Sequence, residues 1–331
     1  MRGPAAAATR PIPSLDPTRL RQAMEEINGR SLPAELEHWA GEYAKVGHRN
    51  AFLWKWCQEG VSLTTLPCVD PALREVNIIT KVLGVMLDVL LDDVADRSTD
   101  DLYLDRLLRI PFAKGAPDFS EFTAPQQAYA EATRRVWQTI ESRASAYRRF
   151  EEFRHLWRFD YAQVFNAMRF SQIVNRDPLV LNMVEHDHYS PHNMHMMVSG
   201  TLDLMCSSGF DHNELGLIRQ VLWHGQCMGR IGNLVTTWER EVGDRDFTSG
   251  VFARTVEKGD VTARELVAMD ADGLREAVRS AECEDYFLSR WSQHRDQIVD
   301  MSESIQSVNV LKLVRGLEQL IQLHLGSRGL K

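Results

Sequence analysis

Three aspartates follow a long apolar stretch of this 331-residue chain. Asp92 and Asp96 are four residues apart, which places both carboxylates on one face of a helix, and Asp93 lies about 100° around it. Asp88 lies one turn before Asp92 on the same face. Carboxylates gathered in this way suit a hard cation such as Mg²⁺, which commonly binds one or two carboxylates together with water and substrate phosphates. A solvated acidic loop is the alternative, because the sequence after Asp96 continues acidic.

The expected position of these acids, at the carboxyl end of a helix, is electrostatically unfavourable. The helix dipole places partial negative charge at that end, where cations are favoured by about 0.3–1 kcal/mol each. Apolar side chains cover most of the circumference between Ile78 and Leu90, which predicts a buried helix. The cluster therefore requires a compensating positive charge, which a metal ion would supply.

A second set of oxygen-bearing side chains lies 141 positions after Asp92. Asn233, Thr237 and Glu241 are spaced four and four residues apart, so their polar groups fall within an arc of about 80° on one helix face. Interior polar residues bonded to the preceding turn, with Glu241 at the surface, would give the same pattern. Together with the aspartates, the set predicts a second group of oxygen ligands for hard cations.

The two sets together resemble the paired metal-binding motifs of bacterial class I terpene synthases. Residues 92–96 are similar to the family's DDxxD motif, and residues 233–241 are similar to its NSE motif. The resemblance implies an all-α, single-domain helical barrel over residues 17–331, which binds an isoprenyl diphosphate and three Mg²⁺ ions. It assigns a supporting role to Asp93 and direct metal binding to Asp92, Asp96, Asn233, Thr237 and Glu241.

The resemblance also indicates diphosphate-binding residues near the chain's carboxyl end. Arg240 stands at a position that is often basic in the family. Arg328 stands where bacterial members have an Arg-Tyr pair that closes over the diphosphate. Gly329 follows Arg328 here, so the tyrosine of that pair is missing.

The family's diphosphate-sensing arginine has no counterpart at its usual place. It normally follows a tyrosine upstream of the NSE motif, whereas Tyr189 is followed here by a run that contains His192, Asn193 and His195. Arg176 and Arg230 are two alternatives. A histidine that donates to the diphosphate, or bonds only within the fold, is another.

The implied reaction requires an apolar cavity next to the metal site. Loss of diphosphate leaves an allylic cation, which the cavity must shield from water and fold for one cyclisation. Aromatic faces stabilise cations, although plain core packing is the alternative role for any aromatic residue. The candidates for the cavity wall are Asp88, Trp157, Phe165, Phe170, Asn193 and Trp223.

Several substrates and functions remain open. The chain lacks the aromatic, Pro-rich opening of many bacterial sesquiterpene cyclases, which favours geranylgeranyl diphosphate and a diterpene product over farnesyl diphosphate. A bicyclic, copalyl-type diphosphate is a further alternative, so an upstream prenyl diphosphate synthase or class II cyclase is a candidate partner. A homodimer is compatible with the family. A chain-elongating prenyltransferase would need a second Asp-rich motif at 233–241, and a non-catalytic helical protein with the same fold is the remaining alternative.

Helical periodicity runs through most of the chain, and strand patterns are nearly absent. Thr262 with Glu265, and Asp211 with Glu214, fit capping boxes, and Gly243 is expected to end a helix. The 125–175 stretch is expected to break near Ser145. Helices are predicted over residues 17–28, 33–46, 71–96, 125–175, 212–242 and 262–269, with two or three more within 272–324.

Composition excludes several other classes of function. The net charge is −8 and the basic residues are scattered, which argues against a nucleic-acid partner. Five cysteines without a CxxC pair argue against a disulfide framework or thiolate zinc site and favour a reducing cytoplasm. No apolar stretch approaches the roughly 20 residues that a membrane span needs. Residues 1–16, with their alanines and prolines, are predicted to be a disordered leader.

Overall fold

The computed structural model describes residues 17–97, 100–113, 115 and 117–329, and these residues form helices and turns without a β-strand. The all-α prediction is confirmed, whereas the predicted leader lies outside the described residues. The α-helices are α1 (Pro17–Gly29), α2 (Ala34–Tyr43), α3 (Ala51–Thr64), α4 (Arg74–Arg97), α5 (Asp101–Leu108), α6 (Ala124–Ser145), α7 (Phe150–Arg176), α8 (Met183–Tyr189), α9 (Met196–Met205), α10 (Leu215–Asp244), α11 (Gly250–Lys258), α12 (Ala263–Ala268), α13 (Ala271–Ser280), α14 (Cys283–Met301) and α15 (Val310–Gly326). Short 3₁₀ turns are η1 (Pro71–Leu73), η2 (Pro178–Val180), η3 (Ser190–Met194), η4 (His212–Glu214) and η5 (Ser302–Ser304).

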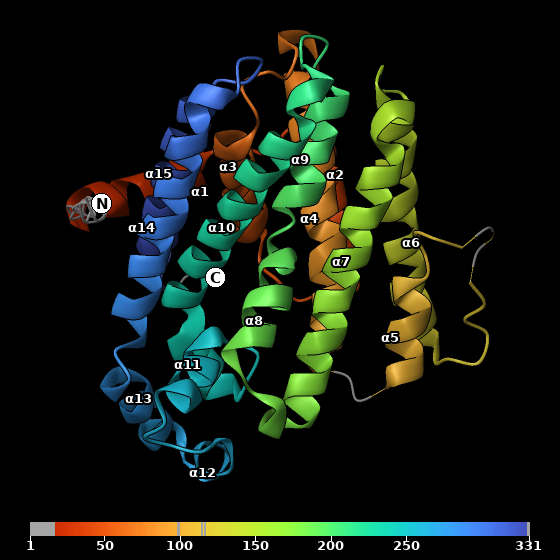
Figure 1. Ribbon diagram of the computed structural model, residues 1–331. Coiled ribbons are helices and arrows are strands. Elements are labelled where there is room, and N and C mark those ends of the chain that lie inside the picture. Colours follow the sequence, from red (N-terminus) through yellow and green to blue (C-terminus); the bar gives the residue numbers. More distant parts are fainter. Residues whose placement is uncertain (1–16, 98–99, 114, 116, 330–331) are drawn as a thin grey trace, which may run out of the picture.

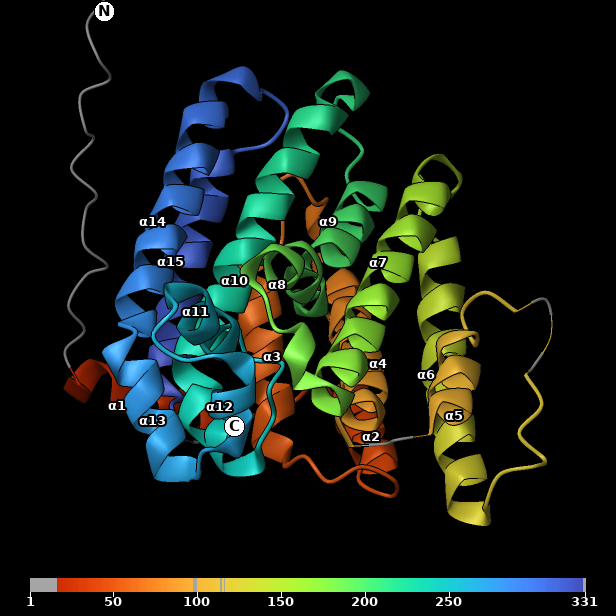
Figure 2. The same cartoon turned by 60° about the horizontal axis from the view of Figure 1, so that its bottom comes forward.

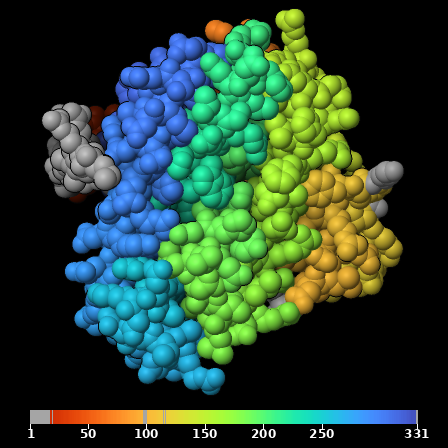
Figure 3. All heavy atoms as spheres, in the orientation of Figure 1, coloured from red at the N-terminus to blue at the C-terminus, as the bar shows by residue number. Residues whose placement is uncertain are grey.

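The long helices run along one common direction (Figure 1). Helix α10 packs against α9, α14 and α15, whereas α4 packs against α3, α6 and α7. Helix α9 and the turn η3 contact both α10 and α7, and so connect the two groups. Helix α8 packs against η3 and lies near the middle of the tilted view (Figure 2). The space-filling view shows α14 and α10 adjoining along one face (Figure 3). One hydrophobic core joins buried residues from α2 to α15.

Most of the predicted helices are confirmed. The 125–175 stretch divides into α6, which ends at Ser145, and α7, which begins at Phe150. The 272–324 region contains three helices. The capping box at the start of α12 is present, because Thr262 Oγ1 accepts from Glu265 N–H and Glu265 Oε2 accepts from Thr262 N–H.

The second predicted capping box is wrong. Asp211 accepts from the backbone N–H of Asn213, and the Glu214 carboxylate does not return to Asp211. Glu214 instead accepts from the backbone N–H groups of Gln306 and Ser307, in the loop before α15. A tertiary contact has replaced the local one, so this carboxylate joins the start of α10 to the loop before α15.

The predicted end of α10 at Gly243 is also wrong, because the helix continues to Asp244. Arg245 then adopts a left-handed conformation with φ 54°, and its guanidinium donates to the carbonyls of Val267 and Met269. These contacts to the loop around α12 hold an arginine where glycine is more usual.

Five helices, α3, α5, α8, α9 and α11, were not predicted. In α9 every residue is buried, so no amphipathic stripe marks it in the sequence. Helix α3 begins at a cap in which Asn50 accepts from the Leu53 N–H. Among the described helices, none combines the length and apolar character that crossing a bilayer demands.

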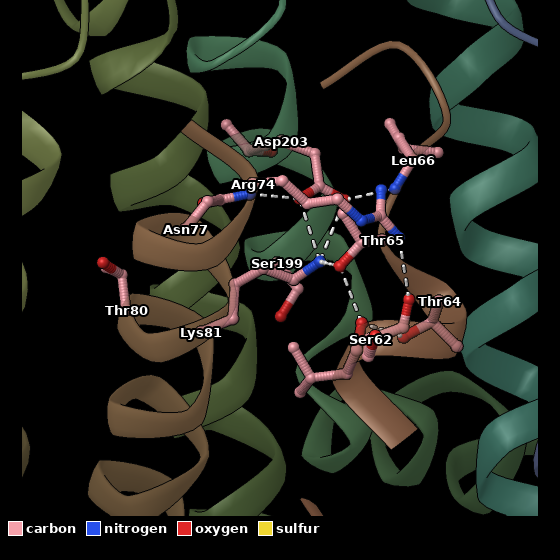
Figure 4. A network of polar contacts seen from close by, with 12 residues as sticks. Ser62, Thr64, Thr65, Leu66, Arg74, Asn77, Thr80, Lys81, Ser199 and Asp203 are labelled. Carbon is pink, nitrogen blue, oxygen red and sulfur yellow. Dashed lines mark hydrogen bonds and ion pairs between the residues drawn. The ribbon is translucent and has the colours of Figure 1, made fainter. Parts of the chain in front are cut away.

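A buried ion pair joins α4 to α9 (Figure 4). Lys81 Nζ lies 2.9 Å from both carboxylate oxygens of Asp203 and 3.1 Å from Thr65 Oγ1. Asp203 also accepts from Asn77 Nδ2 at 2.6 Å and from the Leu66 N–H at 2.8 Å. Burial lowers the pKa of Lys81 and raises that of Asp203, and their attraction opposes both shifts. The network fixes α4 against α9 and the end of α3.

Candidate functional site

The two predicted ligand sets line one polar pocket, although they lie far apart in the sequence. Asp92 and Asp96 reach it from α4, and Asn233, Thr237 and Glu241 reach it from α10. The pocket encloses about 990 Å³ when counted to its open mouth. The long-range placement expected from the two motifs is therefore present in the structure, and we call this space the mouth pocket.

On the α4 side, the carboxylates carry an excess of negative charge. Asn193 Nδ2 lies 3.3 Å from Asp92 Oδ1 and donates to it. Burial, reinforced by Asp246 across the pocket, raises the pKa of Asp92 to about 6, although Arg230 opposes the shift. Burial and the charge of Asp92 raise the pKa of Asp96 well above its usual range. Both shifts indicate that a cation here would be strongly favoured.

Asp93 differs from its neighbours because it has its own cation. Arg49 donates to Asp93 Oδ1 from Nη2 at 2.6 Å and from Nε at 3.1 Å, and Tyr43 Oη donates to Oδ2 at 3.1 Å. Asp93 is not among the residues that line the mouth pocket. Burial, with Asp93 adding to it, raises the pKa of Tyr43 to about 12. The Asp93 carboxylate therefore holds the loop before α3 against α4.

On the α10 side, the hydroxyl of Thr237 lies 2.7 Å from Glu241 Oε1 and 2.9 Å from the carbonyl oxygen of Asn233. Glu241 Oε2 is buried and accepts no hydrogen bond of ordinary geometry from a described residue. The Ser249 hydroxyl lies close enough to the carboxylate to oppose the rise in its pKa. Burial raises the pKa of Glu241, and Arg230 opposes this. Arg230 Nη1 also donates to Asn233 Oδ1 at 3.3 Å. An acceptor oxygen without a hydrogen bond of ordinary geometry thus lies beside a cationic donor.

The predicted arginines separate into two groups. Arg230 and Arg240 line the mouth pocket, and Arg240 Nη2 lies 4.0 Å from Glu241 Oε1. Arg328 does not: its Nη2 donates to the carbonyl of Val235 at 2.6 Å and lies 3.2 Å from the Glu284 carboxylate. The expectation that Arg328 faces the pocket is not met, because Glu284 and the outer side of α10 hold it.

Of the alternatives for the missing sensor, Arg230 is at the pocket and Arg176 is not. Arg176 forms an exposed ion pair with Asp101, at 2.8 Å. Sequence reasoning missed Arg49 and Asp246, which also line the mouth pocket. Both lie in loops, so no helical spacing connects them to the motifs.

An apolar cavity, which we call the chamber, adjoins the mouth pocket and shares Trp56, Val89, Asp92, Asn193, Met194 and His324 with it. It encloses about 890 Å³ counted to its opening. Asp88 and Asn193 line it, as predicted for cavity residues. Its apolar wall includes Trp56, Val61, Val85, Val89, Met168, Met194, Met196, Leu222 and Leu320.

The four aromatic cavity candidates do not line the chamber, and that prediction is wrong. They pack in the surrounding core, in the ring pairs Trp157–Trp137, Phe165–Phe112, Phe170–Tyr189 and Trp223–His192. Trp56 of α3 lines both the chamber and the mouth pocket instead. It was missed because α3 itself was not predicted.

The donor set of the mouth pocket fits a hard cation that is shared with a ligand. Within the described residues, no three His, Cys, Asp or Glu side chains lie close enough together to hold a metal ion. The oxygens of α4 and α10 face a common space from two sides, and Glu241 Oε2 is buried there without a hydrogen bond of ordinary geometry from the described chain. Mg²⁺ bound by these oxygens would need additional oxygens from water or from a phosphate.

The chain matches no protein-family model and no curated protein. What the site can do is therefore decided by its own side chains and shape. These are a polar, acid-rich mouth lined by three arginines, Arg49, Arg230 and Arg240, and an apolar chamber that shares part of its wall.

Proposed function

We propose that the protein is a Mg²⁺-dependent class I terpene cyclase, which ionises an isoprenyl diphosphate and cyclises the resulting cation. One observation carries the proposal: a pocket with two facing sets of oxygen ligands adjoins an apolar chamber and shares lining residues with it. The diphosphate of such a substrate requires cations and donors, whereas its hydrocarbon chain requires an apolar wall. A single molecule with both parts would fill both spaces.

The mouth pocket supplies the groups that a diphosphate needs. Asp92 and Asp96 on α4 would hold Mg²⁺ together with Asn233, Thr237 and Glu241 on α10. Bound Mg²⁺ supplies positive charge that neutralises the diphosphate as it leaves. Arg230 and Arg240 would donate charge-assisted hydrogen bonds to the diphosphate oxygens, in the role that the missing sensor arginine plays in the family.

The chamber supplies what the carbon chain and its cation need. Its wall is formed largely by aliphatic and methionine side chains, which exclude water that would quench the cation. Trp56 lines both spaces, and its ring would stabilise a cation that forms near the mouth.

The substrate we propose is geranylgeranyl diphosphate, with a diterpene as product. Farnesyl diphosphate and a bicyclic, copalyl-type diphosphate are the alternatives. A prenyl diphosphate synthase, or a class II cyclase for the bicyclic substrate, would supply the substrate in the cytoplasm.

The direct test is incubation of the purified protein with each of the three diphosphates, with Mg²⁺ and with excess chelator. We expect diphosphate release and a hydrocarbon or terpene alcohol in organic extracts, with Mg²⁺ only. Glu241→Gln should lower the rate about 10²–10³-fold, by analogy with loss of one preorganised charge-stabilising group. Glu239→Gln is the matched control, because Glu239 is exposed on the same helix and pairs with Arg279. No product from any of the three diphosphates would refute the proposal.

A further inference from the structure

A second polar group lies in the wall of the chamber, away from the mouth. Asp88 of α4 and His195, at the start of α9, both line the chamber and are only 6% and 2% exposed. Asp88 lies one helical turn, about 5–6 Å, before Asp92 along α4. If the proposed function holds, a diphosphate at the mouth therefore places carbon atoms of its chain, and not its oxygens, beside this pair.

The His195 ring is held in an unusual way. Its backbone has φ 59° and ψ 9°, a left-handed conformation that is costly for a residue with a side chain. Gly84 of α4 lies directly under the ring, and a Cβ at that position would be 2.5 Å from His195 Cε1. His195 Nδ1 lies 3.2 Å from Ser199 Oγ. The backbone, the glycine and the serine together determine where Nε2 is directed.

Several polar atoms around the ring lack partners, which is unusual for buried groups. His195 Nε2, both carboxyl oxygens of Asp88 and the Tyr161 hydroxyl have no hydrogen bond from any described residue. His195 Nε2 lies 3.7 Å from Asp88 Oδ2, and the Tyr161 ring meets the imidazole edge-on at 5.3 Å between centroids. A purely structural polar group would pair its atoms, as Asp203 does with Lys81. His195 and Asp88 instead line the apolar chamber.

We propose that His195 Nε2 is the base that ends the cyclisation, and this inference rests on the proposed function. When Nδ1 carries the ring hydrogen and donates it to Ser199 Oγ, Nε2 has a free lone pair. That lone pair removes a proton from the carbon next to the last cationic centre. The C–H bond breaks, its electron pair forms the C=C π bond that neutralises the cation, and the proton forms the new N–H bond of an imidazolium.

Asp88 is a positioning residue for this step. Its carboxyl group faces Nε2 at 3.7 Å. Burial and the charge of Asp92 raise the pKa of Asp88 well above its usual range. An imidazolium that forms at His195 would favour the carboxylate form of Asp88, which in turn would stabilise the imidazolium. Burial, reinforced by Lys81, lowers the pKa of His195 to about 3, which keeps the ring neutral before the reaction. A weak base is sufficient here, because a C–H bond next to a carbocation is a far stronger acid than an imidazolium.

The test compares two readouts in the same reaction: diphosphate release and the distribution of terpene products. His195→Asn removes the base with a residue that tolerates the left-handed conformation. Gly84→Ala keeps the imidazole but must displace it. His212→Asn is the matched control, because His212 is exposed and pairs with Glu152 away from the chamber.

In His195→Asn we expect the rate of diphosphate release to stay within about tenfold of the wild type. The fraction of the total product that is the wild-type product should fall at least about tenfold, and other isomers or alcohols should replace it. Gly84→Ala should shift the products in the same direction, and His212→Asn should not. An unchanged product distribution in His195→Asn, or loss of diphosphate release together with product, would overturn the assignment. If that variant does not fold, Gly84→Ala decides by the same criterion. A wild-type protein that releases no diphosphate would overturn the proposed function, and this step with it.

Discussion

Two buried carboxylate sites lie within a few helical turns of each other, and their surroundings are opposite. Asp203 accepts from Lys81, Asn77 and the Leu66 N–H, so both of its oxygens are satisfied. The acids of the mouth pocket and chamber are not: Asp88 and one oxygen of Glu241 accept no hydrogen bond of ordinary geometry within the described chain. Since unpaired buried charge is destabilising, the comparison separates a carboxylate that holds helices together from carboxylates kept for a ligand.

The largest expected effect comes from disrupting the Lys81–Asp203 ion pair. Lys81→Met leaves Asp203 buried without its cation and should lower the free energy of unfolding by about 3–5 kcal/mol. The double variant Lys81→Met/Asp203→Leu removes both charges and should recover much of that loss. Urea or guanidinium unfolding of the three proteins measures both effects. A single variant as stable as the wild type would show that the ion pair does not hold α4 to α9.

The next effect concerns the mouth pocket and the missing sensor. Arg230→Met should lower diphosphate release about 10²-fold, because it removes a donor aimed at the charge that develops on the leaving group. Arg176→Met is the matched variant, since Arg176 pairs with Asp101 at the surface, and it should leave the rate unchanged. Steady-state measurements with Mg²⁺ decide between the two arginines. A greater loss in Arg176→Met would reverse the assignment.

A smaller effect distinguishes Asp92 from Asp93, because replacing them should change the free energy of unfolding in opposite directions. The folded-state pKa of Asp92 is raised, to about 6, so in metal-free protein its charge destabilises the fold progressively as pH rises from about 4 through 6. Asp92→Asn should therefore match the wild type near pH 4 and be about 1–2 kcal/mol more stable near pH 7. Mg²⁺ should stabilise the wild type at pH 7 and have less effect on the variant.

Asp93→Asn is the control for that measurement and should act in the opposite direction. Asp93 accepts two hydrogen bonds from Arg49 and one from Tyr43, so its loss should destabilise the protein by about 1–2 kcal/mol at pH 7. Thermal melts of both variants across pH 4–7, with and without Mg²⁺, provide the comparison. If both variants lose stability at pH 7, Asp92 stabilises the fold as Asp93 does, and the distinction between them is wrong.

Local periodicity explains which features of the site could be predicted from the sequence. Asp92 and Asp96, and Asn233 and Glu241, share helix faces because their spacing is four residues or a multiple of four, and that geometry does not depend on the rest of the fold. Arg49, Asp246 and Trp56 reach the same space through loops and through α3. Their positions depend on how distant helices pack, and no spacing in the sequence contains that information.

The aromatic residues that were predicted to line the cavity show that a residue's type, too, does not determine its place in the fold. Trp157 and Phe165 lie on a helix that does contribute to the chamber, through Met168. Their own rings pack elsewhere: Trp157 stacks on Trp137 of α6, and Phe165 meets Phe112 in the turn after α5. A large apolar side chain is equally suited to a core and to a cavity wall. Only the packing of neighbouring helices determines which of the two it lines.

The smallest expected effect concerns Arg328, which the resemblance places over the diphosphate and the structure places beside Glu284. Their side chains are 40% and 37% exposed, so Arg328→Ala should change stability by less than about 1 kcal/mol. It should also leave diphosphate release within about threefold of the wild type, because no tyrosine follows to complete the family's pair. Glu284→Gln sharpens the comparison, since it weakens the hold on Arg328 while Trp238 Nε1 keeps its acceptor. If Arg328→Ala slows the reaction tenfold or more and Glu284→Gln does not, the end of the chain closes over the mouth pocket when substrate binds. The ion pair between Arg328 and Glu284 would then exist in the open conformation. Glu284 would be a carboxylate that is paired and yet has a role in function.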